Sequence, residues 1–355
     1  GWPRSMGDQP LHELTVRVES RSGEVSETRS LTIGFRSLKA RKWQTTVNGE
    51  ALYAKGINLA PTAFHLADAT PELILADLQR VEQAGFDLVR PYAHVAPPAF
   101  YEHADRLGLM VWQDLPLLGP ASTSLRGQAV RQTKAMVGQL GHHPSIGVWN
   151  AHVSPSDEWM RAEPPSVRGL ASRLASHQLP TWTKSVLDRS IKRVFDNHDG
   201  SRLTTGFTGV LPHLPRLEGS ATHLWFGWRR GRERDLADFA ARIPSQVRFV
   251  AEFGAQSIPA GGEVAASIDW PAVQVEQLAD LYGYEVASFN RYVPPVGYPD
   301  ADAWIDATQQ YQAGLLRRQI ETLRRLKYRP NGGFCVHFLA DVQPRVSASL
   351  IDHEG

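Results

Sequence analysis

The chain has 355 residues, and its 38 Lys and Arg against 37 Asp and Glu give a formal net charge of +1. This balance, without a long basic run, gives no electrostatic reason to expect binding to nucleic acid or an anionic membrane. No apolar run approaches the roughly 20 residues that span a bilayer, and the first residues lack the pattern of a signal peptide. The single Cys335 excludes an internal disulfide and a cysteine-rich metal site, and leaves localisation open between cytoplasm and secretion. We therefore expect a soluble protein with a neutral or weakly charged ligand.

The first part of the chain predicts a β-hairpin. Leu14, Val16 and Val18 alternate with polar residues, Gly23 follows, and a second extended stretch runs over 28–35. This period of two is typical of paired strands. Because two strands alone are at best marginally stable in water, we expect them to be the end of a sandwich whose other strands precede this chain.

From about residue 39, apolar strands alternate with amphipathic helices, which is typical of a parallel sheet. Eight such strands favour a closed α/β barrel over an open doubly wound sheet, and the stretch 270–299 is expected to lie on the catalytic face as an excursion. No GxGxxG or GxxxxGK[ST] follows a strand, so no nucleotide cofactor is expected. The predicted strands cover 52–59, 86–90, 109–114, 145–151, 203–207, 221–226, 247–253 and 333–339, and the helices 71–84, 98–107, 128–140, 183–197 and 302–327.

Polar residues stand at the predicted carboxyl ends of the strands, where an α/β barrel carries its chemistry. Glu252 ends an apolar strand just before Gly254, which makes it a candidate nucleophile; retaining glycosidases need such a carboxylate with a second one about 5–5.5 Å away. The structural alternative is a carboxylate paired with Arg90. The histidines are more commonly hydrogen-bonded than metal-bound, so no metal is expected. The full set is Asn58, Arg90, Asp114, His152, His223, Glu252 and Asp341.

Several short motifs follow one another along the chain. They include NGE at 48–50, KGIN at 55–58, WQD at 112–114, HPSI at 143–146 with Trp149, and EFG at 252–254 followed by QS. In this order they resemble the catalytic barrel of glycoside hydrolase family 2, especially its β-mannosidase-like branch. The resemblance covers nearly the whole chain and implies a (β/α)8 TIM barrel over residues 39–355, preceded by the last strands of an immunoglobulin-like β-sandwich over 1–38. It also implies that further N- and C-terminal domains belong to a longer parent chain.

The resemblance further implies a hydrolase of β-linked O-glycosides that acts with retention, takes a carbohydrate as its partner and needs no cofactor. Glu252 would be the nucleophile, with Arg90 supporting its carboxylate. The residues that would line the sugar site are Asn58, Arg90, Asp114, Trp149, His152, His223, Trp225, His337 and Asp341.

The chain departs from the family pattern where the chemistry is expected. Ser154 stands at the position of the general acid/base glutamate, and His337 begins the strand-eight segment in which the family carries a tryptophan. A positioned general acid is worth roughly 10²–10⁴-fold, so ordinary glycosides would react slowly. Asp157 or Glu158 could supply the proton, or both could be solvated loop residues. The alternative function is therefore a catalytically degenerate carbohydrate-binding or scaffold protein.

Overall fold

The computed structural model describes residues 1–155, 182–209 and 221–355. Eight parallel strands form one curled sheet in the order β10-β9-β8-β7-β6-β13-β12-β11. Thr208, just beyond β10, bridges in parallel to Ala221, next to β11, so the two edges of the sheet meet. The predicted TIM barrel is thereby confirmed. Its strands are β6 (Ala54–Leu59), β7 (Leu88–Pro91), β8 (Met110–Asp114), β9 (Ile146–Asn150), β10 (Leu203–Thr205), β11 (Thr222–His223), β12 (Val250–Glu252) and β13 (Gly333–Phe338).

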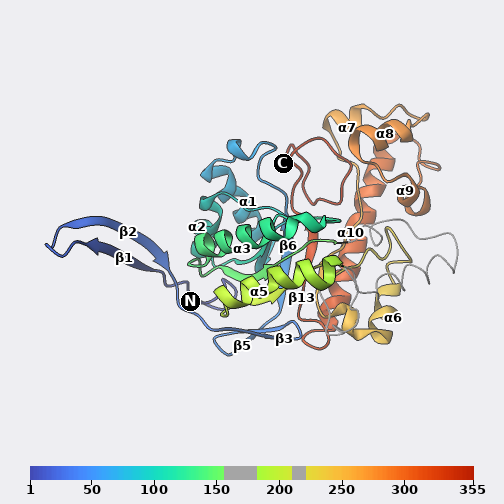
Figure 1. The fold of residues 1–355 in the computed structure, drawn as a ribbon. Coiled ribbons are helices and arrows are strands. Elements are labelled where there is room, and N and C mark those ends of the chain that lie inside the picture. The colour runs from blue at the N-terminus through green and yellow to red at the C-terminus, as the bar shows by residue number, and fades with distance from the viewer. Residues whose placement is uncertain (156–181, 210–220) are drawn as a thin grey trace.

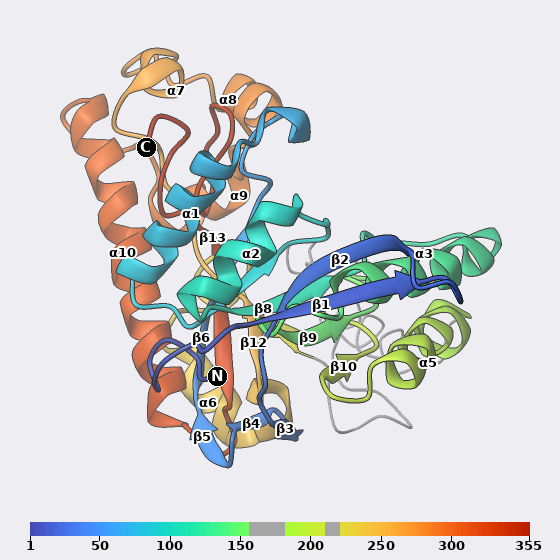
Figure 2. The ribbon, with the colours of Figure 1, turned by 90° about the vertical axis from the view of Figure 1, so that its left-hand side faces the viewer.

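Helices surround the sheet, as Figures 1 and 2 show. Local sequence sets their ends: Thr70 caps the first helix by accepting from the amide of Leu73, and Gly108 ends the second in the left-handed conformation. Within the described ranges, no helix combines the length and apolar composition needed to cross a membrane. The helices around the barrel include α1 (Pro71–Gln83), α2 (Pro98–Leu107), α3 (Arg126–Leu140), α5 (Asp188–His198), α6 (Asp235–Arg242) and α10 (Ala301–Arg325).

A small antiparallel sheet closes the amino-terminal end of the barrel, and the sequence had not indicated it. It consists of β3 (Leu38–Arg41), β4 (Gln44–Val47) and β5 (Glu50–Leu52). The turn between β3 and β4 places Trp43 at a φ of 69° and stacks its ring on Trp112, with centroids 5.1 Å apart. Large aromatic side chains dominate core burial, so this ring anchors the sheet to the barrel floor.

The predicted hairpin is formed by β1 (His12–Glu19) and β2 (Val25–Ile33), and it extends away from the barrel in Figure 1. Leu14 pairs with Leu31, and Val16 and Val18 lie on the same face. This face is exposed. An exposed apolar face on a two-stranded unit fits the expected last strands of a sandwich.

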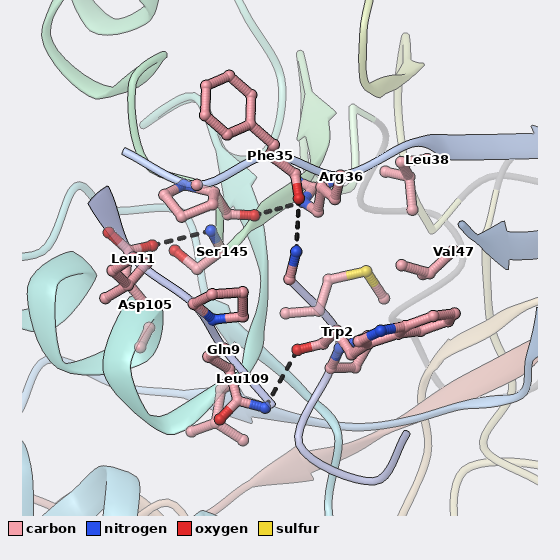
Figure 3. A pocket seen from close by; sticks show the side chains of 18 residues that line it. Trp2, Gln9, Leu11, Phe35, Arg36, Leu38, Val47, Asp105, Leu109 and Ser145 are labelled. Carbon is pink, nitrogen blue, oxygen red and sulfur yellow. Dashed lines mark hydrogen bonds between the residues drawn. The ribbon is translucent and has the colours of Figure 1, made fainter. Parts of the chain in front are cut away.

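The segment around the hairpin docks on the barrel through the junction drawn in Figure 3. Gln9 donates to the carbonyl of Trp2 at 3.2 Å, and Arg36 donates to the carbonyls of Pro144 and Ile146 at the start of β9. A mostly apolar cavity of about 50 Å³ lies between the two parts. These contacts fix the segment at the end of the barrel opposite the candidate site.

A segment between β12 and α10 extends out of the barrel, and it includes the stretch 270–299 for which an excursion was predicted. It contains α7 (Gly262–Ala266), α8 (Val275–Tyr282) and α9 (Val286–Tyr292). Figure 1 shows these helices gathered beside one end of α10. Trp228, Phe289 and Trp304 belong to their shared hydrophobic core, which is distinct from the core behind the barrel strands.

Candidate active site

Glu252 lies at the carboxyl end of β12 and is 1% exposed. Nδ1 of His223, at the end of β11, is 3.3 Å from Oε2 of Glu252. Nδ1 of His337, in β13, is 3.7 Å from Oε1. Because β11 and β13 flank β12, side chains at their carboxyl ends converge. Two other predicted site residues, His223 and His337, thus lie beside the Glu252 carboxylate.

Both imidazoles beside Glu252 are neutral at pH 7. Burial lowers the pKa of His337 to about 4, even though the charge of Glu252 acts in the opposite direction. Burial and the positive charges of Arg90 and Arg229 hold the pKa of His223 well below its usual value. A neutral imidazole can orient a carboxylate through an N–H group without forming an ion pair with it. The two distances are therefore close approaches of neutral rings to the Glu252 carboxylate, and at 3.7 Å the approach of His337 is longer than a hydrogen bond.

Ser154 reaches the same cluster from the loop after β9. Its Oγ lies 3.4 Å from Nδ1 of His223, and its amide donates to the carbonyl of Thr208 at 3.0 Å. Its φ is +46°, in the left-handed region. At Gly209 a Cβ would lie 2.8 Å from the Ser154 hydroxyl and 2.7 Å from the His223 ring, so a larger residue would collide with both. The backbone thus holds Ser154 against His223.

The contacts of His223 do not form a serine hydrolase triad. Such a triad uses one ring nitrogen of the histidine for the serine and the other for the carboxylate. Here Ser154 and Glu252 both approach Nδ1. The arrangement therefore lacks the relay geometry that would activate Ser154 for acyl transfer.

Arg90 does not pair with Glu252, contrary to the expectation that it supports this carboxylate directly. Its Nε donates to both oxygens of Asp114, at 3.1 and 2.9 Å, and its Nη2 donates to Thr208 at 3.0 Å. The guanidinium stands 5.1 Å from the ring centroid of Tyr92. Burial raises the pKa of the Tyr92 phenol well above its usual value, and the charge of Glu252 and the hydrogen bond between the phenol and this carboxylate add to the effect. Arg90 is linked to Glu252 through Tyr92.

Trp149 was expected to line the sugar site, and the structure places it behind the strand. Its Nε1 donates to Asp199 at 2.9 Å, and its ring stacks on Phe195 of α5 with centroids 5.4 Å apart. Successive strand residues point to opposite faces, so the inward neighbour is Asn150, which donates to Asp114 at 2.8 Å. Trp149 packs the barrel against its helix layer.

His152 also lies apart from the cluster. Its Nδ1 is 2.8 Å from Asp188 at the start of α5, and its Nε2 is 2.7 Å from the carbonyl of Gly119. Both ring nitrogens are thus engaged in holding loops. In the part of the chain that the structure describes, no group of three or more His, Cys, Asp or Glu side chains is arranged to hold a metal ion.

Asp341 is turned toward the C-terminal segment. Its carboxylate accepts from the hydroxyls of Ser347 and Ser349, at 2.5 and 2.8 Å, and burial raises its pKa. It lines a polar cavity of about 480 Å³ together with residues of α10 and the C-terminal segment. Neither Glu252 nor His223 lines this cavity. Asp341 is therefore separated from the predicted site.

The two remaining predicted residues lie close to the cluster. Asn58 is the next-to-last residue of β6. Its side-chain amide donates to the carbonyls of Ala251 and Val336, both at 3.0 Å, and so links β6 to β12 and β13. The indole of Trp225 presents its edge to His337, with centroids 5.0 Å apart. Asn58 thus contacts the strand that carries Glu252, and Trp225 contacts an imidazole that lies beside this carboxylate.

Comparisons with known proteins agree with the barrel fold. The chain is 21% identical over 388 residues to β-mannosidase A of Aspergillus niger, and 23% identical over 389 residues to that of Emericella nidulans. Each match covers 91% of this chain and 41% or 40% of the relative, so the chain spans about two fifths of the length of these relatives. No family model matches the chain.

The solved structures agree on the fold. A β-D-mannosidase of Dictyoglomus thermophilum superposes with a TM-score of 0.73 at 21% identity, over 99% of this chain and 44% of that one. A β-glucuronidase of Parabacteroides merdae gives a TM-score of 0.68 at 15% identity, over 99% of this chain and 43% of that one. The chain resembles the β-mannosidase-like barrel of glycoside hydrolase family 2.

Within the barrel, the structure adds residues that the sequence analysis missed. Tyr92 lies two positions beyond Arg90, where the alternation of β7 would have pointed it inward. Arg229 stands 4.3 Å over the Trp225 ring and donates to Glu285 at 2.6 Å. Glu285 opens α9, so no local pattern in the sequence could have joined it to the loop after β11.

Proposed function

We propose that this chain carries the barrel of a retaining β-glycoside hydrolase of β-mannosidase type, with Glu252 as its nucleophile. The observation that supports this most is the position of Glu252 at the end of the seventh barrel strand, between the neutral imidazoles of His223 and His337. The relatives named β-mannosidase support the sugar class. Residues 1–38 are proposed to belong to the preceding sandwich domain and residues 39–355 to the barrel.

In the proposed reaction, an oxygen of Glu252 attacks the anomeric carbon of a bound β-glycoside and forms a glycosyl ester. Water then hydrolyses that ester at the same carbon, so the configuration is retained. His223, His337 and Tyr92 orient the carboxylate and shape the space around it. Asn58 and Trp225 frame the sugar. Ser154 stands where a general acid is needed, and an unperturbed hydroxyl does not release its proton near pH 7.

A second candidate function is carbohydrate binding without turnover. It is favoured by Ser154 at the acid position and by the burial of the cluster, since Glu252 and His223 are 1% exposed and Ser154 is 3% exposed. In that case Glu252 would have only a structural role, in holding the strand ends together. Both candidates predict a carbohydrate ligand, and they differ in whether Glu252 reacts.

Covalent trapping distinguishes the two candidates. The folded chain is incubated with a panel of 2-deoxy-2-fluoro-β-glycosyl fluorides, beginning with the mannosyl compound, and its intact mass is measured. We expect one added glycosyl unit that maps to Glu252, because fluoride leaves without a general acid. Glu252→Gln should abolish the adduct, and Glu102→Gln, on the exposed side of α2, should not. No adduct from any sugar would favour binding without turnover.

A further inference from the structure

One end of the barrel carries an exposed cluster of positive charge that the candidate site does not use. The cluster lies on the small sheet of β3 to β5 and on the carboxyl end of α10 with the turn that follows it, which Figures 1 and 2 place at the same end of the molecule. Glu252 lies at the opposite end of the barrel strands. We call this cluster the basic surface, and its exposed cations are Lys39, Arg41, Lys42, Arg324, Arg325, Lys327 and Arg329.

Direct contacts hold the two segments of the basic surface together. The side-chain amide of Gln44 donates to the carbonyl of Tyr328 at 2.9 Å, so the start of β4 lies against the turn after α10. Behind this turn, Tyr53 and Tyr328 meet edge to face, with ring centroids 6.3 Å apart. A Cβ at Gly332 would collide with the carbonyl oxygen of Trp43, so the two backbones are in contact. Residues that are 284 positions apart in the chain thus form one surface.

The charges of the basic surface are mostly unneutralised. Among the residues that the structure describes, only Arg325 of this set is paired with a carboxylate, that of Glu321 at 3.7 Å, and both side chains are exposed. An exposed pair of this kind contributes little and is screened by salt. The whole chain carries a formal charge of only +1, so the sequence outside this cluster is net negative. The positive charge is therefore concentrated at one end of the barrel, where it attracts anions.

The outward face of the small sheet combines cations with hydrogen-bonding side chains. Residues directly opposite each other in an antiparallel pair share a face, so Lys39 lies beside Thr46, and Arg41 beside Gln44. The alternating residues point toward the barrel, where Val47 is buried. This face of β3 and β4 therefore offers partners for carboxylates and hydroxyls, and no large apolar side chain for insertion into a membrane.

We propose that the basic surface binds an acidic polysaccharide, a polymer whose sugar units carry carboxylate groups. Four of its seven cations are arginines, and a guanidinium binds a carboxylate through two parallel hydrogen bonds. The amide of Gln44 and the hydroxyl of Thr46 lie among these charges and can bind sugar hydroxyls. Such binding would tether the barrel to the polymer by the end opposite Glu252. The inference goes beyond the proposed function and does not require Glu252 to react.

Nucleic acid and anionic lipid are also polyanionic, and the composition of the basic surface favours neither. Single-stranded nucleic acids stack their bases on exposed aromatic rings. The ring of Tyr328 is 38% exposed, but Nζ of Lys327 stands over it at 5.5 Å and Tyr53 packs against it. Binding to either polymer would therefore rest on charge alone, whereas an acidic polysaccharide also uses the hydroxyl and amide groups.

The test is binding of the folded chain to alginate, a polymer of uronates, with mannan as the neutral counterpart. Isothermal titration calorimetry measures Kd. We expect alginate to bind and mannan not to bind, and the Kd for alginate should rise about tenfold or more between about 50 and about 200 mM salt, because several ion contacts form. The combined variant Lys39→Glu, Arg41→Glu, Arg324→Glu should weaken alginate binding about tenfold or more at the lower salt concentration.

The matched control reverses three exposed cations on other elements: Arg17 on β1, Arg131 on α3 and Arg193 on α5. The combined variant Arg17→Glu, Arg131→Glu, Arg193→Glu changes the net charge equally and should alter the Kd for alginate by less than about threefold, because salt screens distant charges. Circular dichroism checks that both variants are folded. Glu252→Gln should bind alginate as tightly as the unsubstituted chain.

Several outcomes would overturn the inference. Absence of alginate binding, or equal binding of mannan, would show that the cations hold no acidic polysaccharide. Equal losses from the two combined variants would mean that overall charge, and not this surface, is responsible. Tighter binding of a short DNA duplex or of phosphatidylserine vesicles would assign the surface to another polyanion. Loss of alginate binding in Glu252→Gln would place the polymer in the candidate site. The proposed function is tested separately, by the labelling of Glu252.

Discussion

Arg90 places its Nε between the two carboxylate oxygens of Asp114, at 3.1 and 2.9 Å, and neither side chain is exposed. The amide of Ala93 and the side chain of Asn150 donate to the same carboxylate, at 3.0 and 2.8 Å. Attraction and hydrogen bonds offset the desolvation of the two ions. The pair joins β7 and β8 at their carboxyl ends, next to the phenol that faces Glu252.

Breaking this pair from one side should be strongly destabilising. Asp114→Asn leaves the Arg90 guanidinium buried without its counter-charge, and we expect a loss of about 3–5 kcal/mol in the free energy of unfolding. Urea denaturation measures it. Glu321→Gln removes an exposed carboxylate that lies 3.0 Å from Arg317 on α10, and should change stability by less than about 0.5 kcal/mol. Equal effects from the two variants would show that burial does not determine how much the Arg90–Asp114 pair contributes to stability.

The barrel floor provides a second stability prediction. Trp43 is 7% exposed and stacks on Trp112, so Trp43→Ala should leave a cavity and lower stability by about 3–5 kcal/mol. Phe64→Ala removes an aromatic ring that is 63% exposed and should have an effect within about 0.5 kcal/mol. Thermal or urea unfolding of both variants measures the two losses in stability. A small loss from Trp43→Ala would mean that β3 to β5 are held without this ring.

Local periodicity was sufficient to predict the barrel. Helices α1 (Pro71–Gln83) and α2 (Pro98–Leu107) lie within one residue of the predicted ranges 71–84 and 98–107. The sheet of β3 to β5 was missed because its strands are short and mostly polar, and because Trp43 takes a positive φ that sequence alone does not reveal. Tertiary packing of the indole, and not local propensity, sets that turn.

The candidate site was predictable where strand ends determine position. Glu252, His223 and His337 end neighbouring strands, so their convergence follows from the topology. The placement of Trp149 follows from the two-residue alternation that points Asn150 inward, and the motif resemblance obscured this. His152 lies beyond the strand end, where its contacts with distant loops decide its direction.

Stability should fall as acid is added through the range in which free histidine titrates. Burial lowers the pKa of His337 from 6.5 to about 4, so the unfolded chain binds this proton more readily than the folded one. The stabilising effect is therefore complete above pH 6.5 and is lost as the pH falls toward 4. It amounts to at most about 3 kcal/mol, an upper bound because 18% of the side chain is exposed.

Urea denaturation at several pH values across this window measures the effect. His337→Asn should flatten the dependence, whereas His65→Asn, at an exposed position, should leave it unchanged. The buried His223 acts in the same direction, so a residual slope is expected in the first variant. A slope of opposite sign would show that the folded protein binds the His337 proton more tightly than the unfolded chain does.

Arg229 connects the excursion to the cluster and should control the titration of its imidazoles. Its guanidinium lies 4.3 Å from the Trp225 ring and 2.6 Å from Glu285. The charged and titratable groups that act on His337 are Glu252, Arg229, His223 and Arg345, of which only Glu252 raises its pKa.

Arg229→Gln removes one of the lowering charges, so NMR titration of His337 should show its pKa moving upward, toward 6.5. Glu285→Gln keeps Arg229 in the chain but removes its carboxylate partner. In a double-mutant cycle the two variants should couple by about 0.5–3 kcal/mol in the free energy of unfolding, nearer the lower value because both side chains are partly exposed. If Arg229→Gln leaves the His337 titration unmoved, the guanidinium is too well screened to act on the cluster, and its contact with Glu285 serves only to hold α9 in place.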